Sequence, residues 1–404
     1  MVSTRRRVVI TGLGPVSSVG IGIAQFSASI RDGKCGTKPV ESFDATGFLR
    51  KAGGEVSDFR PGDILRRLVP DAAPWGRSAL FAASAARLAA DDAGLDLNGS
   101  RAAVVMGTTS GETPAIVAMV ESWRRDGWGS PDRWTAAQVP ASKLGLAAAQ
   151  ELGTKGEVIT LGAACAAGNY ALGYAYDLLS LGAADIAVAG GADSVDRFTH
   201  AGFHRTGALA ADVCRPFDAE RDGVVPGEGG AALILEELDH ALARGARIYA
   251  ELLGYAMTCD GKSPVAPDAE SIARCIRTAH HRAGVTPDQV DYICAHGTGT
   301  RLNDSVEAEA VRAVFGQKPP PMSAIKSMLG HAMGAAAGFG GIACAVSISA
   351  GFLPPTLNHR ITDPDLTGLD VVPNHSREEK VRIAQNNGFG FGGNNAVVIL
   401  GSVR

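Results

Sequence analysis

Cys165 has surroundings that suit a nucleophile. Every residue of the segment 161–168 other than Leu161 and Cys165 is glycine or alanine, so a substrate can approach the sulfur closely. An Ala-rich helix is predicted to begin beside it, and the free N–H groups and positive dipole end of a helix start favour the thiolate. Since free cysteines are most often small buried residues, a structural cysteine remains the alternative for this segment taken alone.

Two histidines follow predicted strands in the second half of the sequence. His296 directly precedes Gly-Thr-Gly-Thr, in which the hydroxyls of Thr298 and Thr300 can donate and accept hydrogen bonds. His331 is predicted to open a second Ala-rich helix, and Lys326 adds a cation shortly before it. Each motif alone is compatible with a structural histidine or a charged loop.

Taken together, one cysteine and two histidines at strand ends are what acyl transfer requires. Cys165 would be the nucleophile, and His296 and His331 would donate hydrogen bonds to the oxyanions that develop during reaction. This combination is far more specific than any of its members.

The elements that must hold these residues follow an α/β pattern, in which short apolar runs alternate with longer Ala-rich stretches. Strands are expected at residues 7–12, 102–106, 158–161, 186–189, 231–236, 248–254, 292–295, 322–325, 382–385 and 396–400. Helices are expected at residues 76–93, 143–151, 166–181, 271–283, 304–315 and 331–350.

The order of these elements predicts a duplication. A strand, a turn of small residues and an Ala-rich helix occur over residues 158–181 and again over 322–350. Cys165 lies in the turn of the first unit and His331 at the predicted helix start of the second. We therefore expect two similar halves that meet near residue 250, with the chemistry where their strand ends face each other.

Composition excludes several other classes of protein. The 404 residues are 46% hydrophobic and 20% charged, with a net charge of −4 and no basic stripe, so a nucleic-acid partner is not expected. Glycine and proline interrupt residues 8–20 after the arginines at 5–7, which does not fit a signal peptide, and no uninterrupted apolar stretch suits a membrane helix. We expect a cytoplasmic protein without a membrane partner. The seven cysteines are scattered singly, so neither a metal site nor a disulfide framework is predicted.

Nearly the whole chain resembles the β-ketoacyl-acyl-carrier-protein synthases, especially the elongating condensing enzymes of fatty-acid and type II polyketide synthesis. The resemblance implies an α/β fold of the thiolase type, with a duplicated five-layer α/β/α/β/α arrangement. It implies an N-terminal half at 1–250, which carries the nucleophile and a dimer face, and a C-terminal half at 251–404. The segments that carry it are 8–14, the turn around Cys165, 215–218, 296–300, 326–331 and 388–395.

The resemblance also assigns catalytic roles. Cys165 would take an acyl group from the phosphopantetheine thioester of an acyl carrier protein, and the enzyme itself would bind no cofactor. His296 and His331 would then hold the thioester carbonyl of a malonyl unit while it loses carbon dioxide and attacks, in a decarboxylative Claisen reaction. Lys326 would support His331 electrostatically.

Further roles concern the walls of the site. The resemblance implies that Thr298 and Thr300 bond the pantetheine arm. The backbone N–H groups of Cys165 and Phe389 would form the oxyanion hole, and the side chain of Phe389 would gate the pocket. Ser110 would lie beside the acyl chain, where a small residue admits a longer or branched chain. Besides the carrier protein, the partner would be an identical chain or a subunit like a chain-length factor.

One departure from the family leaves alternatives open. Gly340 stands where the family usually has a glutamate that bonds the lysine, so an enzyme that cyclises a Cys-bound β-ketoacyl chain without elongation remains an alternative. A non-catalytic partner subunit would not need Cys165, which family partners of that kind replace. A degradative thiolase would need a second reactive cysteine near its C-terminus, yet none follows Cys344. An interaction module would need none of these groups.

Overall fold

The computed structural model describes residues 6–69 and 75–403 of the chain. Within these ranges all ten expected strands are present, with ends that differ from the expected ones by a few residues. They are β1 (Val8–Ser17), β5 (Ala103–Thr108), β6 (Val158–Gly162), β7 (Ile186–Asp193), β8 (Gly229–Glu237), β9 (Ala250–Cys259), β10 (Tyr292–Cys294), β11 (Met322–Ser323), β14 (Ile383–Gly390) and β15 (Asn394–Gly401).

The strand order repeats between the two halves of the chain. The first half has the order β6-β5-β7-β8-β1, and the second half has the order β11-β10-β14-β15-β9. In both, the first three strands are parallel and the last two pairings are antiparallel. β1 pairs with β9 over Val8–Ile10 and joins the halves into one sheet path. The predicted duplication is therefore confirmed.

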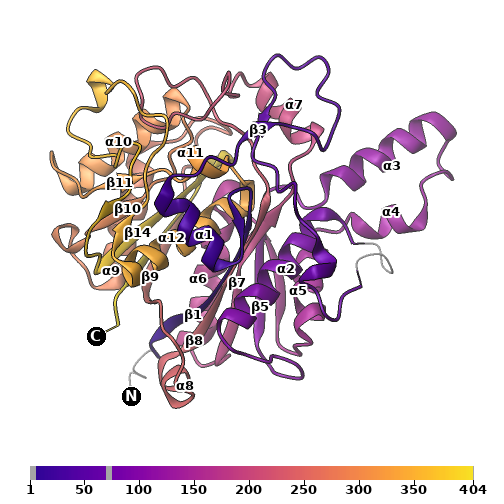
Figure 1. Cartoon of the computed structure of the whole chain (residues 1–404), viewed down its shortest axis with the longest axis horizontal. Coiled ribbons are helices and arrows are strands. Elements are labelled where there is room, and N and C mark those ends of the chain that lie inside the picture. The colour runs from indigo at the N-terminus through magenta and orange to yellow at the C-terminus, as the bar shows by residue number, and fades with distance from the viewer. Residues whose placement is uncertain (1–5, 70–74, 404) are drawn as a thin grey trace.

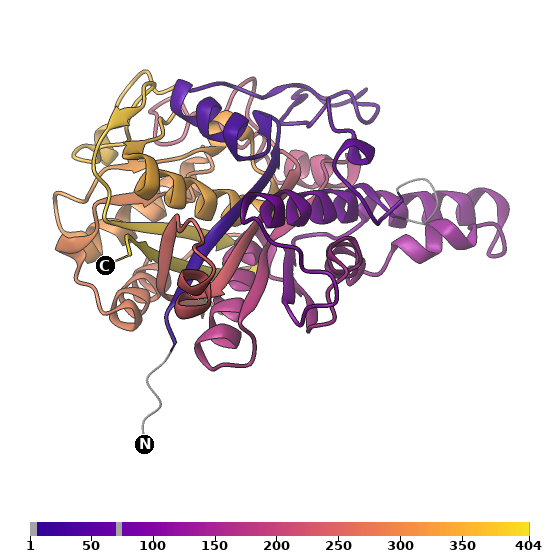
Figure 2. The ribbon, with the colours of Figure 1, turned by 60° about the horizontal axis from the view of Figure 1, so that its bottom comes forward.

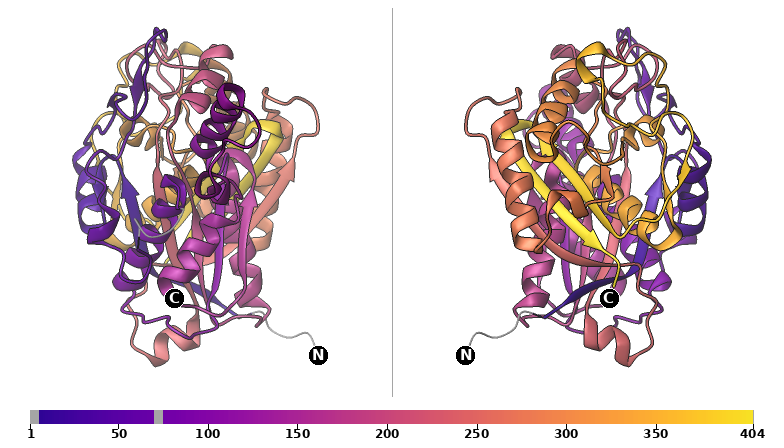
Figure 3. Two further views of the ribbon diagram at one scale, coloured as in Figure 1. Left: turned by 90° about the vertical axis from the view of Figure 1, so that its right-hand side faces the viewer. Right: turned by 90° about the vertical axis from the view of Figure 1, so that its left-hand side faces the viewer.

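Helices cover and separate the two halves, which gives the predicted five layers (Figure 1). One pair covers the outer face of the first half and another pair the outer face of the second, where the orange helices lie outside the yellow strands (Figure 3). A central pair lies between the halves. The three pairs are α2 (Arg77–Asp92) with α5 (Lys143–Leu152), α9 (Ala269–Ala283) with α10 (Arg301–Phe315), and α6 (Ala167–Ser180) with α12 (Ala336–Ala350).

The central helices pack closely because small residues face each other. A Cβ on Gly168 of α6 would lie 2.5 Å from the backbone nitrogen of Gly338 of α12. The segment Met333–Ala350 is long and apolar enough to cross a membrane, but most of it is buried inside the fold, as expected of a core helix. Its low polarity reflects its place between two sheets.

The sequence pattern missed several elements, some of which bury little apolar surface. The hairpin formed by α3 (Thr113–Asp126) and α4 (Arg133–Gln138) extends away from the body, and α3 buries only Thr113 and Ala115 (Figures 1 and 2). The other missed helices are α1 (Ile23–Asp32), α7 (Arg197–Arg205), α8 (Leu238–Ala243) and α11 (Lys326–Leu329). The missed strands are β2 (Gly20–Ile21), β3 (Lys38–Pro39), β4 (Ala52–Gly53), β12 (Phe352–Leu353) and β13 (Arg377–Glu378).

Gly340 lies where α12 packs on β14, so adding a side chain at this position tests how tightly the two elements pack. A Cβ there would lie 2.2 Å from Oδ1 of Asn386, whose carboxamide is fixed by hydrogen bonds to Asn169 and Ala337. Gly340→Ala should therefore lower the free energy of unfolding by about 1–3 kcal/mol in denaturant titrations, despite the better helix propensity of alanine.

Gly202 of α7 is the matched control, because no atom lies within 4 Å of a Cβ built there. Gly202→Ala should leave stability unchanged or raise it by up to about 1 kcal/mol. Equal stability of the two variants would contradict the packing around Gly340.

Candidate active site

Cys165 lies in the tight turn that joins β6 to α6. The turn is a single 3-10 turn, Ala164–Ala166, and α6 begins at Ala167, as the sequence predicts. Ala164 adopts a positive φ of 47°, which is uncommon for a residue with a Cβ. The sharp turn places the thiol, which is 7% exposed, at the bottom of a pocket.

His296 begins the connection between β10 and α10. The Glu307 carboxylate of α10 accepts the backbone N–H groups of His296 and Gly297, each at 2.8 Å, and so fixes the backbone of this connection. Nζ of Lys326 lies 3.4 Å from Nδ1 of His296 and also donates to its carbonyl oxygen. Because an ammonium group can only donate, Nδ1 of His296 accepts and Nε2 carries the proton.

His331 does not open a helix, contrary to the prediction. It lies after α11, in a bridge with Pro226, and α12 begins at Ala336. Positive φ angles at Gly330 and Met333 interrupt the helical path that the alanine-rich pattern suggested. The N–H of Met333 donates to Nδ1 of His331 at 3.2 Å, so the proton of this neutral ring is also on Nε2.

Both imidazoles are neutral donors near pH 7. The two rings lie 5.6 Å apart, and His296 and His331 are 3% and 2% exposed. Burial holds the pKa of each well below its ordinary value, and the positive charge of Lys326 acts in the same direction. Two neutral Nε2–H groups in one pocket can stabilise a single developing oxyanion.

Lys326 acts on His331 through its charge, which lowers the pKa of that ring, in line with the expected electrostatic influence. The sequence did not suggest its direct contact, which is with His296. Burial lowers the pKa of Lys326, and the nearby Glu307 carboxylate opposes this shift. Gly340 stands where the family usually has a glutamate that bonds the lysine. In this chain Glu307 provides the negative charge near Lys326.

The Cys165 thiol is protonated in the free enzyme, contrary to the expectation that the helix start favours thiolate. Burial raises its pKa to about 11, although the charge of Lys326 acts to lower it. Desolvation of an anion outweighs the helix start here. The thiol must therefore lose its proton during the reaction.

The N–H group beside the sulfur is that of Phe391, whereas the prediction was Phe389. The backbone N–H groups of Phe391 and of Cys165 itself both act to lower the pKa of the thiol, which places them beside the sulfur. The ring of Phe389 is 4% exposed and packs 5.7 Å from the His296 ring, while Phe391 is 44% exposed and lines the pocket. β14 ends at Gly390, whose backbone lies close to the Cys165 turn: a Cβ built there would lie 3.1 Å from the Cys165 nitrogen. The next residue, Phe391, is therefore the one that follows this close approach.

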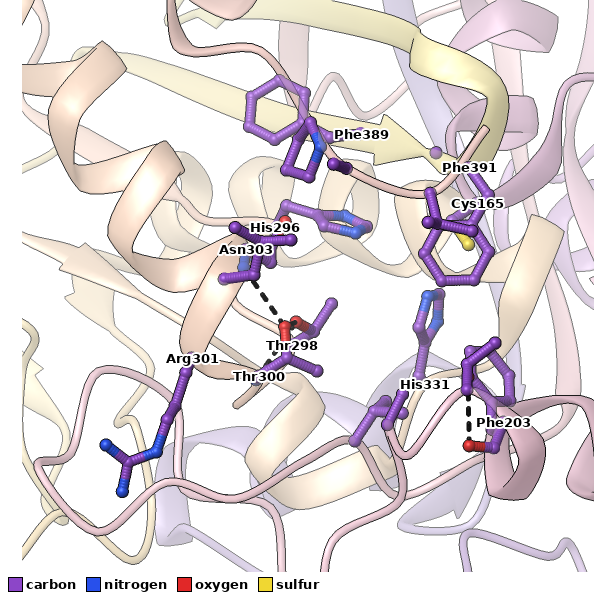
Figure 4. Close-up of a pocket in the computed structure, with 18 of the residues that line it drawn as sticks. Cys165, Phe203, His296, Thr298, Thr300, Arg301, Asn303, His331, Phe389 and Phe391 are labelled. Atoms are coloured by element: carbon purple, nitrogen blue, oxygen red, sulfur yellow. Dashed lines mark hydrogen bonds between the residues drawn. The ribbon is translucent and has the colours of Figure 1, made fainter. Parts of the chain in front are cut away.

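The pocket has a volume of about 430 Å³ and brings together most of the predicted site residues (Figure 4). Lys326 is absent from its lining because it lies behind His296. Ser110 is also absent, since it follows β5 and its N–H is held by Asp193 at 3.1 Å. The predicted residues that line the pocket are Cys165, His296, His331, Phe389, Thr298 and Thr300. Lining residues that the sequence did not single out include Phe203, Arg301 and Phe391.

Two buried polar groups fix the elements around the pocket. The Asp193 carboxylate accepts from Ser110 N–H and from Gly334 N–H, and so ties the loop after β5 to the turn after His331. The Asn169 carboxamide, on α6, donates to the carbonyls of Asn386 on β14 and Ala396 on β15 at 3.1 and 3.0 Å. These contacts set the position of the Cys165 turn relative to the strand that leads to Phe391.

The arrangement suits carbon–carbon bond formation through a thioester. A thiol, two N–H donors beside it and two neutral imidazole donors could hold an acyl-enzyme and stabilise an enolate in the same pocket. Among residues 6–69 and 75–403, no group of three His, Cys, Asp or Glu side chains is arranged to hold a metal ion.

Comparison with known proteins agrees with this chemistry. Residues 5–241 match the family model described as beta-ketoacyl synthase, N-terminal domain, and residues 249–360 match beta-ketoacyl synthase, C-terminal domain. The chain is 37% identical to Nodulation protein E of Rhizobium sp. (strain N33), over 98% of this chain and 100% of that one. It is also 37% identical to 3-oxoacyl-(acyl-carrier-protein) synthase 2 of Synechocystis sp., over 98% and 97%.

Solved structures show the same architecture. The ishigamide ketosynthase/chain length factor has a chain that is 48% identical, with a TM-score of 0.96 over 99% of this chain and 100% of that chain. A type II polyketide synthase ketosynthase bound to the hexaketide, in complex with its acyl-carrier protein, is 31% identical, with a TM-score of 0.90 over 99% and 100%.

The protonated state of Cys165 can be tested by alkylation with iodoacetamide. Because the pKa is raised to about 11, the labelling rate of Cys165 should rise about tenfold per pH unit between about pH 7 and 9. Lys326→Met removes the cation that lowers this pKa and should slow labelling at pH 8 by at least about threefold, the effect of about half a pKa unit.

Peptide mapping of the same samples follows the exposed Cys35 as an internal control, whose rate Lys326→Met should not change. A labelling rate at Cys165 that reaches a plateau below pH 8 would show that the thiolate already dominates.

Proposed function

We propose, from the premise that this chain belongs to the β-ketoacyl synthase family, that it condenses a Cys165-bound acyl chain with a malonyl-type thioester in polyketide or related specialised biosynthesis. The observation that carries the proposal is the meeting of Cys165, His296 and His331 in one buried pocket, with both imidazoles neutral.

The first half-reaction transfers an acyl group to the enzyme. The Cys165 sulfur attacks the thioester carbonyl of an acyl carrier protein as its proton leaves, and the carrier thiol departs with a proton. The tetrahedral oxyanion accepts hydrogen bonds from the backbone N–H groups of Cys165 and Phe391, which lie beside the sulfur and lower the pKa of the thiol. Because the thiol is neutral at rest, its proton must be given up as the carbon–sulfur bond forms, and the departing carrier thiolate takes up a proton in the same half-reaction.

The second half-reaction forms the carbon–carbon bond. The thioester oxygen of the malonyl unit accepts the Nε2–H groups of His296 and His331. The carbon–carbon bond to the carboxylate breaks and carbon dioxide leaves. The electron pair of that bond forms the enolate, which attacks the acyl carbonyl on Cys165. Expulsion of the sulfur releases a β-ketoacyl thioester that is two carbons longer. Neutral imidazoles suit this step because they donate to the enolate oxygen without protonating it first.

The substrate would reach Cys165 on the phosphopantetheine arm of its carrier protein. We assign Thr298 and Thr300 to this arm, because their hydroxyls lie 2.9 Å apart in the pocket wall. Phe391 lies at the exposed side of the pocket beside Phe203. We therefore assign the gating role to Phe391 and not to Phe389. The protein would need no cofactor of its own.

A second subunit is supported by the edge of the sheet. The residues of β6 are exposed or half-buried, whereas β11 at the other edge is buried. An exposed strand edge next to the Cys165 turn suits pairing with another chain. We propose a dimer across the N-terminal half (1–250), with an identical chain or a chain-length-factor-like subunit, in the cytoplasm. The C-terminal half (251–404) contributes both histidines.

The structure weakens the case for cyclisation without elongation. Gly340 was the reason to consider it, but this residue packs against Asn386 and does not line the pocket, so it makes no room for an unusual substrate. A non-catalytic partner subunit is disfavoured by retention of the thiol and both imidazoles. Elongation is therefore the activity that these residues support best.

Incubation of the protein with acyl- and malonyl-carrier proteins tests elongation directly. We expect carbon dioxide and a product two carbons longer, while Cys165→Ala loses acyl loading and His331→Ala loses at least about a hundredfold in condensation. Release of carbon dioxide is followed by coupled assay and the product by mass spectrometry. If Cys165-dependent rearrangement of a β-ketoacyl thioester occurs but no donor is elongated, cyclisation is the correct function.

The predicted role of Ser110 in chain-length selection is tested by added volume. Ser110→Phe should shift the product profile toward shorter chains, because a bulky ring would fill space beside the acyl chain. Ser110→Ala, which removes the hydroxyl without adding volume, should keep the wild-type profile. An unchanged profile for Ser110→Phe would place the acyl chain elsewhere.

A further inference from the structure

The polar groups of the pocket wall follow one another in a fixed order. The connection between β10 and α10 carries His296, Thr298 and Thr300, and α10 begins with Arg301; all four line the pocket. His296 is buried near Cys165, whereas Arg301 is exposed at the outer side, with the two threonines between them (Figure 4). From the depth of the pocket to its mouth, the polar groups along this segment are therefore an imidazole, two hydroxyls and a guanidinium.

Arg301 is a charged group without a partner of its own. Its guanidinium makes no hydrogen bond or ion pair with residues 6–69 or 75–403; only its backbone carbonyl is bonded, by Arg221. The acidic groups around it are already engaged. Asp363 is paired with Arg221, although the charge of Arg301 also acts on it at longer range, and the Asp304 carboxylate of the same helix accepts the backbone N–H groups of Thr298 and Gly299.

Asp222 is the other charged residue of the pocket lining, and it does not pair with Arg301 either. Its carboxylate lies 3.4 Å from Arg50 and accepts the N–H of Ala211 at 3.0 Å. The mouth of the pocket therefore presents one unpaired cation. Guanidinium groups bind phosphate through two parallel N–H donors, which makes a phosphate ester a well-matched ligand.

We propose that Arg301 binds the phosphodiester of the carrier arm and thereby fixes how deeply the arm enters the pocket. This inference rests on the proposed function and deepens it. With the thioester at Cys165 and the amides of the arm beside Thr298 and Thr300, the phosphate end emerges at the mouth, where Arg301 stands. The order of donors along the wall thus matches the order of thioester, amide and phosphate along the arm.

The test compares two small thioesters that differ only in the phosphate. Wild-type enzyme and Arg301→Gln are each given acyl-pantetheine or acyl-phosphopantetheine, and kcat/KM for acylation of Cys165 is measured by intact-protein mass spectrometry. We expect Arg301→Gln to lose about tenfold with acyl-phosphopantetheine, in line with a hydrogen-bonded charge pair, and less than about twofold with acyl-pantetheine. Arg301→Lys should recover part of the loss.

Arg101→Gln is the matched control. Arg101 is also exposed, but it precedes β5, so it lies at the strand end opposite to the site. This variant has the same change of charge and should leave both thioesters unaffected. A third measurement uses acyl-carrier protein as the acyl donor. It is needed because acidic side chains of the carrier protein could bind Arg301 in place of the phosphodiester.

The outcomes separate this inference from the proposed function. Equal losses with both small thioesters, no loss with either, or a loss with the carrier protein alone would each overturn the role of Arg301 while Cys165 still loads. Failure of wild-type enzyme to load from any thioester, carrier-bound thioesters included, would overturn the proposed function and this inference with it.

Discussion

The burial of Lys326 and the two histidines between the two halves of the fold is the constraint on which the site depends. Burial of the two imidazoles is the larger reason that both stay neutral, and the Lys326 cation, which is 5% exposed and bonds His296, adds to it because a second positive charge nearby is costly. Burial of the Cys165 sulfur itself keeps the thiol protonated, against the charge of Lys326, which acts to lower its pKa. The site is thus uncharged at its reacting atoms, and its donors act on charge that the reaction itself creates.

The duplicated fold explains how such a site can be rigid. Cys165 follows β6, while His331 lies between β11 and α12, in the equivalent unit of the second half. Buried carboxamides and carboxylates then fix these units to each other: Asn169 joins α6 to β14 and β15, and Asp193 joins the loop after β5 to the turn after His331. Fully buried polar groups of this kind are costly unless bonded, which makes the alternative arrangements of these loops unfavourable.

Most of the framework could be predicted from the sequence, because buried strands and Ala-rich helices leave clear apolar patterns. The α3–α4 hairpin could not, since it buries little and its pattern carries no core signal. Cys165 and the two histidines were identifiable as a group. The choice between Phe389 and Phe391 was not, because both are flanked by glycine and only the turn after Gly390 decides which N–H reaches the sulfur. The partner of Lys326 and the protonation of Cys165 depend on three-dimensional burial, which the local sequence does not contain.

The neutrality of His296 and His331 is the central physical claim, and nitrogen NMR of the histidine-labelled enzyme tests it most directly. Spectra between about pH 5 and 8, with His296→Asn and His331→Asn used to assign the two rings among the nine histidines, report the protonation of each nitrogen. The account predicts that both rings stay neutral, with the proton on Nε2, down to at least about pH 6. A titration of either ring near its ordinary value of about 6.5 would contradict it.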